Sequence, residues 1–248
     1  YKLNGGTDQT VTTITGNAVT VAQPTGTAGT FTYTLVSVKD NSSTACVQAQ
    51  TGTAAITVNP LPTATITGTT SVCKGVSSPN VTFTGAGGTA PYTFTYKLNG
   101  GTDQSVTTIT GSAVTVAQPT GVTGTYTYTL VSVKDNSSTA CVQAQTGTAA
   151  ITVNPLPTAT IAASAAAICQ NAATPNVTFT GAGGTAPYTF TYKLNGGTDL
   201  TVTTTTGNTV TVVQPTGTAG TFTYTLVSVK DNSSSACVQV QTGTAAIT

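Results

Sequence analysis

Apolar and polar residues alternate along much of this chain. The clearest stretch is residues 92–98, where large side chains alternate with threonine and lysine: Tyr92, Phe94, Tyr96 and Leu98 against Thr93, Thr95 and Lys97. A period of two residues predicts a β-strand with one buried face. The Asn99-Gly100-Gly101 sequence that follows supplies residues suited to positive φ, and therefore predicts a tight hairpin.

The same alternation, interrupted by Gly, Pro and Asn, divides this region into short strands. We predict strands at residues 63–67, 81–84, 92–98, 105–110, 113–116, 125–133 and 142–153, with an irregular loop at residues 71–79. Within residues 125–133 the inward set shifts by one position after Leu130, to Val131 and Val133, which predicts a β-bulge. Seven short strands in about 95 residues are typical of an immunoglobulin-like sandwich.

The pattern is repeated along the chain. The sequence VSVKD occurs at residues 36–40, 131–135 and 227–231, at spacings of 95 and 96 residues. We therefore predict three copies of one domain: a partial first copy (residues 1–61) without its N-terminal strands, a complete second copy (62–156) and a nearly complete third copy (157–248). Because the chain starts inside a copy, we expect it to be a section of a longer protein.

Two proline-containing links join the copies, Asn59-Pro60-Leu61-Pro62 and Asn154-Pro155-Leu156-Pro157. Two prolines in so short a link favour an extended and semi-rigid connection. The predicted fold is thus all-β, with tandem immunoglobulin-like β-sandwich domains in a linear rod of about 40 Å per copy.

Composition narrows the possible functions. The chain has seven Lys, six Asp and about a quarter Thr, and it has no Arg, Glu, His, Met or Trp. The usual general acids and bases are therefore scarce, and we predict neither an enzyme nor a cofactor. A net charge of +1 without a basic cluster argues against nucleic acid as a partner. No apolar run approaches the ~20 residues that membrane insertion as a helix requires.

The five cysteines follow the repeat. Cys73 and Cys141 are 68 residues apart, as are Cys169 and Cys237, so we predict one structural disulfide within each complete copy. Such a bond would contribute roughly 4 kcal/mol in the chain-entropy model. Cys46 is the counterpart of Cys141 and is expected to be unpaired in this sequence, its partner lying upstream. Buried free thiols are the alternative, and metal binding lacks a supporting His or CxxC.

Other candidate sites have simpler interpretations. Gly85–Gly88 resembles a phosphate-binding loop, but it leads into a strand rather than a helix, so we predict a flexible interstrand loop. Asp103 and Asp135 are candidate calcium ligands, yet each copy has only two separated Asp residues, which favours turn formation.

Strand surfaces offer two further candidates. Lys97 and Lys134 are candidates for intramolecular isopeptide links, although strand lysines more often keep an edge soluble. Outward Thr125, Thr127 and Thr129 form a hydroxyl row that would suit ice or glycans, whereas threonine is also simply a good β-former on a solvated face.

Several of these segments together resemble a known class of repeat. They are GGTAPYTFTY, GTYTYTL, the VKD turn and a Cys before the final strand. They are similar to the immunoglobulin-like or PKD-like tandem repeats of giant cell-surface adhesins of gliding and related Bacteroidota, which the type IX secretion system exports. The resemblance implies an elongated, multi-copy extracellular protein at the cell surface, acting in adhesion or surface motility. Separately, we expect surface glycans or other copies of itself as partners.

The function that these features favour is a structural or adhesive extracellular stalk, part of a much longer adhesin or fibre. Near-identical copies in series add length, and repeated weak contacts add avidity. Two alternatives remain at this level. One is a repeated module that binds a carbohydrate or surface weakly, and the other is a subunit of a self-assembling extracellular filament. Disulfides would fit either, because they also indicate an oxidising, extracellular setting.

Overall fold

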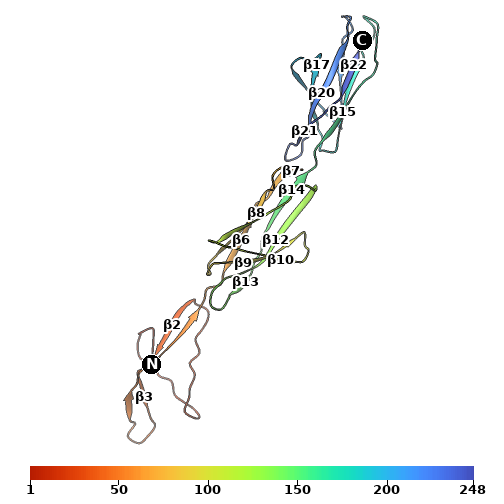
Figure 1. Cartoon of the computed structure of the whole chain (residues 1–248). Coiled ribbons are helices and arrows are strands. Elements are labelled where there is room, and N and C mark those ends of the chain that lie inside the picture. The colour runs from red at the N-terminus through yellow and green to blue at the C-terminus, as the bar shows by residue number, and fades with distance from the viewer.

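A computed structural model describes residues 1–248. The chain forms an elongated all-β rod, with its first residues in the unit at one end and the C-terminus at the other (Figure 1). The strands of the three copies follow one another along this rod. No helix in the structure is long and apolar enough to cross a membrane.

The second copy is a sandwich of two sheets. The smaller sheet has the order β11-β8-β6, formed by Ala113–Ala117, Asn80–Ala86 and Thr63–Thr67. The larger has the order β10-β9-β12-β14-β7, formed by Asp103–Thr107, Thr93–Leu98, Gly124–Lys134, Thr148–Asn154 and Thr70–Cys73, and β13 (Val142–Ala144) also pairs with β12. All pairs are antiparallel except β7 with β14. This is the immunoglobulin-like arrangement that the sequence predicts.

The third copy repeats the arrangement. One sheet has the order β15-β16-β19, formed by Thr158–Ala163, Asn176–Ala182 and Thr209–Val213. The other contains β18 (Asp199–Thr203), β17 (Thr189–Leu194), β20 (Phe222–Lys230), β21 (Val238–Val240) and β22 (Thr244–Ile247).

Each of these two sandwiches has an aromatic core drawn from the alternating positions. In the second copy Phe83 and Phe94 are fully buried, and the ring of Phe83 lies 5.0 Å from that of Tyr96. The inward prediction for Tyr92, Phe94 and Tyr96 is confirmed by exposed fractions of 5% or less. Because a buried Phe truncated to Ala typically costs 3–5 kcal/mol, these rings are expected to contribute substantially to the stability of the second copy.

The structure differs from the sequence prediction at two connected places. The predicted bulge is present, because the register of β12 with β9 shifts between Leu130 and Ser132. Opposite the bulge, however, the single predicted last strand is divided into β13 and β14. Gln145 N donates to Val131 O at 2.8 Å and Leu130 N to Gly147 O at 2.9 Å. The extra residue in β12 therefore has to be matched by a break in its partner.

The segment predicted to be an irregular loop begins with a strand instead. Residues 70–73 form β7, which runs parallel to β14 in a register that places Cys73 opposite Asn154. Only Val72 has a strongly apolar side chain in this stretch. The strand therefore depends on hydrogen bonding to the edge of β14 rather than on alternation, and the pattern of side chains did not reveal it.

The first copy has β-structure but no buried core. It contains β1 (Lys2–Leu3), β2 (Gly29–Thr34), β3 (Ser37–Lys39), β4 (Val47–Ala49) and β5 (Thr53–Val58). Residues 18–22, the counterpart of β11, have no counterpart of β8 to pair with. Val19 and Val21 are accordingly 43% and 38% exposed, and Ile56 is 41% exposed where its counterpart Ile151 is fully buried. Half a sandwich cannot bury its apolar face.

The Gly85–Gly88 segment is a packing feature rather than a flexible loop. A Cβ on Gly85 would lie 2.6 Å from the Tyr92 ring, and one on Gly88 would lie 2.6 Å from Oδ2 of Asp135. Tyr92 in turn donates its hydroxyl to Gly88 O at 2.8 Å. Glycine is needed at both positions because the Tyr92 ring packs directly against the backbone of Gly85, and the Asp135 carboxylate against that of Gly88.

We expect Gly85→Ala to lower the free energy of unfolding of the second copy by about 1–3 kcal/mol, because the added methyl group overlaps a buried ring. Pulsed deuterium labelling in increasing urea, read by mass spectrometry, reports each copy separately and leaves the third copy as a reference. Gly121→Ala is the matched control, since a Cβ there meets nothing within 4 Å. Equal stability of the two variants would contradict this account.

Candidate functional site at the junction between copies

The second and third copies meet across a very short linker. β14 ends at Asn154, β15 begins at Thr158, and Pro155, Leu156 and Pro157 lie between them. The end of β14 is further fixed by Lys74, whose N–H donates to Asn154 O at 2.8 Å. The linker prolines have fixed φ angles and no N–H, so the connection has little conformational freedom.

The loop between β20 and β21, residues 231–237, approaches this linker from the third copy. Its conformation depends on Asp231, which is 2% exposed. The Asp231 carboxylate accepts hydrogen bonds from Ser233 Oγ at 2.8 Å, Cys237 N at 2.8 Å and Thr185 N at 3.1 Å. A buried carboxylate that accepts hydrogen bonds from its own loop and from Thr185 organises the turn and positions Cys237. The predicted turn-forming role of the equivalent Asp135 is confirmed by the same contacts from Ser137 and Thr89.

In the second copy, the surroundings of the equivalent Asp135 favour its ionised carboxylate. Burial by itself raises the pKa of Asp135, but hydrogen bonds from Ser137, Thr89 and Cys141 outweigh it and hold the pKa below its ordinary value. In the first copy, hydrogen bonds from Ser42 and Cys46 likewise lower the pKa of Asp40.

An asparagine of the preceding copy recognises the loop. Asn154 Nδ2 donates to Ser235 Oγ at 2.8 Å and lies 3.3 Å from Ser234 Oγ. Ser234 Oγ also donates to Ser71 Oγ at 2.7 Å. The other junction uses the same contact, because Asn59 Nδ2 donates to Thr139 Oγ1 at 2.9 Å and to Ser138 Oγ at 3.2 Å. The two junctions of this chain are therefore held by one repeated interaction.

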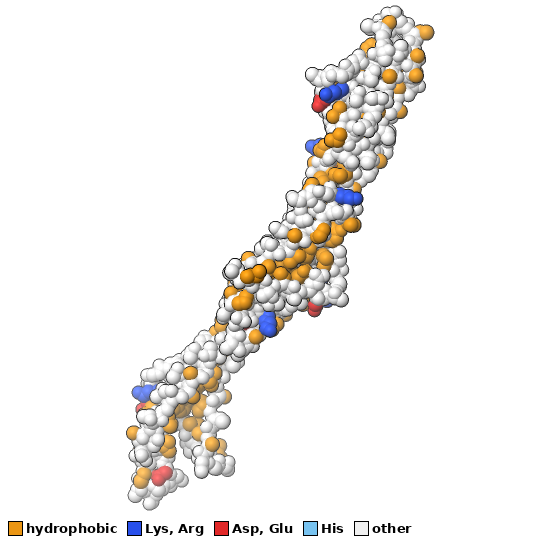
Figure 2. Space-filling view, viewed as in Figure 1, with side chains coloured by type: hydrophobic (Ala, Val, Ile, Leu, Met, Phe, Trp, Pro, Cys, Tyr) orange, Lys and Arg blue, Asp and Glu red, His pale blue; other side chains and the backbone are white.

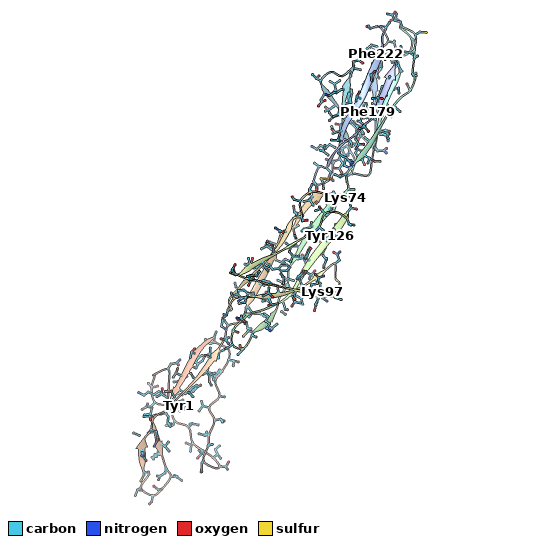
Figure 3. All side chains as sticks on the ribbon, in the orientation of Figure 1. Tyr1, Lys74, Lys97, Tyr126, Phe179 and Phe222 are labelled. Carbon is cyan, nitrogen blue, oxygen red and sulfur yellow. A yellow bond between two sulfur atoms is a disulfide. The ribbon has the colours of Figure 1, made fainter.

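A disulfide closes the second of these junctions. Cys73, at the end of β7, is bonded to Cys237 in the loop of the third copy, with their Cα atoms 5.6 Å apart. Figure 3 shows Lys74, the residue next to Cys73, at the place where the two copies meet. The bond joins residues 164 apart in sequence and makes a second covalent connection between the copies.

This pairing corrects the prediction of a disulfide within each copy. Cys73 lies beside Asn154 at one end of the second sandwich. Cys141 follows the far end of β12, a strand of 11 residues that begins opposite Val153. At about 3.3 Å per residue the two cysteines are separated by roughly 35 Å, whereas bonded cysteines require Cα atoms within about 7 Å. The predicted Cys73–Cys141 bond is therefore wrong, and so is Cys169–Cys237 by the same geometry.

The other three cysteines are free thiols. Cys46 and Cys169 are exposed, and Cys141 is half-buried. Hydrogen bonds from the Thr44 and Ser42 hydroxyls lower the pKa of the Cys46 thiol. The prediction that Cys141 and Cys169 are disulfide-bonded within their copies is not met, because their predicted partners are bonded to each other.

The remaining candidate residues form ordinary surface contacts. Lys97 and Asp103 face each other across the hairpin at 3.8 Å, and both side chains are largely exposed, which fits a solubilising role rather than a buried isopeptide. The outward Thr125 hydroxyl lies 3.3 Å from that of Thr152 on the neighbouring strand. No three His, Cys, Asp or Glu side chains come together as a group that would hold a metal ion.

The free end of the third copy is hollowed beside Cys169. A cavity of about 260 Å³ there is lined by a set that includes Ile168, Cys169, Thr216, Phe222 and Thr248. Figure 3 places Phe222 toward this end of the rod, beyond Phe179 in the core. The cavity lies on the face of the third copy that corresponds to the junction face of the second copy.

No protein-family model matches the sequence, and no curated protein matches it either. Among solved structures, a Ca²⁺-stabilised adhesin with which an Antarctic bacterium binds ice is 17% identical, with a TM-score of 0.45, over 88% of this chain and 57% of that one. A 1.5-MDa bacterial ice-binding adhesin is 15% identical, with a TM-score of 0.41, over 87% and 72% of the two chains. A tetra-tandem repeat from the extending region of a large adhesion protein is 15% identical, with a TM-score of 0.29, over 88% and 57%.

We expect alkylation of the unfolded, non-reduced chain to label three of its five cysteines, because the structure leaves Cys46, Cys141 and Cys169 free. Trypsin should then release residues 40–74 linked to residues 231–248, with residues 135–193 unlinked. Pairing within copies would instead label only Cys46 and place residues 135–193 in the linked product. Cys73→Ser is the control, in which residues 231–248 should be recovered as a free peptide.

We also expect Asp135→Asn to destabilise the second copy by about 1–3 kcal/mol near neutral pH, since hydrogen bonds to a charged group are lost. The folded pKa of Asp135 lies below its ordinary value of 3.8. Its ionised form therefore stabilises the folded copy above that value, and the contribution is lost as the pH falls through the folded pKa. The difference from the parent chain should thus stay constant from pH 7 down to about pH 5, and shrink as the pH falls below 3.8.

The control for this experiment is Asp40→Asn, which alters the same loop in the first copy, where no core surrounds it. Pulsed deuterium labelling in urea should show the second copy unchanged by Asp40→Asn. A pH-independent effect of Asp135→Asn would show that the carboxylate acts through its shape rather than its charge.

Proposed function

We propose that this chain is a section of an extracellular stalk, in which each copy is one rigid domain and the series holds a binding part away from its attachment point. The longer protein would be a cell-surface adhesin or fibre that serves attachment or surface motility. The tandem copies, the elongated shape and a composition in which the usual general acids and bases are scarce support this role over an enzymatic one (Figure 1).

The observation that carries the proposal is the doubly connected junction. Most linked domains move relative to each other, because a single flexible linker joins them. Here the second and third copies share a three-residue linker, the Asn154 contact with Ser234 and Ser235, and the Cys73–Cys237 bond. Two covalent connections at separate points restrict both bending and rotation, which is what a stalk requires.

The surface is also suited to such a role. Figure 2 shows few charged side chains, scattered along the rod, with uncharged polar surface and hydrophobic side chains between them. The structural disulfide supports an extracellular location, because such bonds persist mainly in oxidising compartments. A stalk needs stiffness and solubility rather than a concave binding site.

The disulfide also changes how tension would pass along the chain. A force applied at Tyr1 and Thr248 reaches Cys73 through β6 and β7, crosses to Cys237 and leaves through β21 and β22. The intervening residues of both sandwiches carry no load while the bond is intact. The end-to-end length of the stalk would therefore increase little even if these two sandwiches unfolded.

Single-molecule stretching from the two termini tests this proposal. The fully stretched oxidised chain should be shorter than the reduced chain by about 570 Å, from a separation of 164 residues at ~3.5 Å per residue. Cys73→Ser should behave like the reduced chain without any reductant. An oxidised chain that reaches the full reduced length would contradict a load-bearing junction.

A further inference from the structure

The three free cysteines all occupy positions that are bonded elsewhere in the chain. Cys46 and Cys141 are the counterparts of Cys237, and Cys169 is the counterpart of Cys73. By analogy with the Cys73–Cys237 bond, each of these three cysteines would pair with a cysteine of an adjacent copy, which we call its complementary position. No residue of this sequence occupies the complementary position of any of the three. For Cys141 the complementary position is 95 residues before Cys73, which precedes Tyr1 in the register of the repeat. For Cys169 it is 96 residues after Cys237, which in the register of the repeat falls beyond Thr248.

The junction around Cys141 already has the geometry of the bonded junction. Asn59 contacts Ser138 and Thr139 as Asn154 contacts Ser234 and Ser235. This agreement occurs where no disulfide is present. The hydrogen bonds and the proline linker are therefore sufficient to place the cysteine loop of one copy against the end of the copy before it.

The face around Cys169 has the structure of an unoccupied junction. Ile168 N donates to Thr248 O at 2.8 Å and Thr248 N to Ala166 O at 3.0 Å, so the parallel pairing that holds β7 against β14 has begun here. Cys169 is exposed where Cys73 is half-buried, and Ala167 is exposed where Ser71 is half-buried. The difference is expected for a face that the next copy covers in one case only.

The sequence around this cysteine changes while the cysteine is kept. SVCKGVSSPN in the second copy becomes AICQNAATPN in the third. Lys74 and Ser71 are replaced by Gln170 and Ala167, so most side chains near the junction differ. The cavity beside Cys169, with Ile168 and Phe222 in its lining, provides apolar surface at the same place.

We propose that consecutive copies of this repeat are joined by a disulfide at every junction, and that Cys169 is the acceptor for the cysteine loop of a following copy. Each internal copy then has one bond to the copy before it and one to the copy after it. The bonds form a continuous covalent ladder along the array. The inference rests on the proposed arrangement of copies in series, but not on the adhesive role.

The chemistry is an ordinary thiol oxidation. Each of the two thiols gives up its proton, one sulfur–sulfur bond forms, and the two electrons reduce a disulfide oxidant such as oxidised glutathione to two thiols. The loop of the following copy supplies the second sulfur from the position of Cys237. The linker and the asparagine contact bring the two sulfurs together before oxidation.

The test is a chain lengthened by one copy, made by adding a second Val153–Thr248 sequence after Thr248. This chain has seven cysteines, five from the original sequence and two from the added copy. After refolding with a glutathione redox pair at low protein concentration, the ladder leaves three thiols for alkylation: Cys46, Cys141 and the added counterpart of Cys169. The C-terminal tryptic peptide should be recovered linked to residues 135–193.

Each other outcome overturns the ladder. Five alkylated thiols would mean that the new junction stays open, and one would mean pairing within copies. In the control Cys169→Ser, four thiols should be labelled and the C-terminal peptide should be unlinked. A non-reducing gel confirms that the bonds lie within one chain. If the new junction stays open while X-ray scattering still shows a straight rod, the ladder fails and the stalk does not.

Discussion

The direction in which β12 and β20 cross their sandwiches determines where the functional groups of each copy lie. β12 begins opposite Val153, beside the linker to the next copy, and ends at Lys134 near the preceding copy. The Asp135–Cys141 loop is therefore always at the end of a copy that faces backward along the rod. β7 ends at the opposite face, where its parallel pairing with β14 places Cys73. A cysteine facing forward and a cysteine facing backward can meet only across a junction.

Much of the fold follows from the alternation of apolar and polar residues. The strands that this pattern missed are set by backbone pairing instead. Residues such as Phe83, Phe94 and Leu130 specify their strands because their side chains alternate with polar ones and fill one core. β7 was not predicted because its place is set by backbone hydrogen bonds to β14. The division between β13 and β14 was not predicted either, although the bulge that requires it was.

The disulfide could not be predicted from spacing for a related reason. The 68-residue interval between Cys73 and Cys141 recurs between Cys169 and Cys237 because the sequence repeats. Any two positions within one copy keep their spacing in the next copy, so a constant interval does not show that the two residues are bonded. The informative feature was strand direction: counting strands from Cys73 to Cys141 would place them at opposite ends. Likewise, the Gly85–Gly88 sequence indicated a loop, whereas its glycines admit the Tyr92 ring and the Asp135 carboxylate.

Because the copies are nearly identical, the cysteine loop of any copy could in principle bond to Cys73. The structure has to select the loop of the adjacent copy. The geometry favours the adjacent copy, because a three-residue linker with two prolines confines the next loop to one small region. Asn154 then selects the orientation in which Ser234 and Ser235 face it. Confinement of this kind raises the effective concentration of the correct thiol far above that of a distant copy or a second chain. The Asn154 contact thus sets the orientation of the third copy against the second, and the Cys73–Cys237 disulfide preserves that orientation.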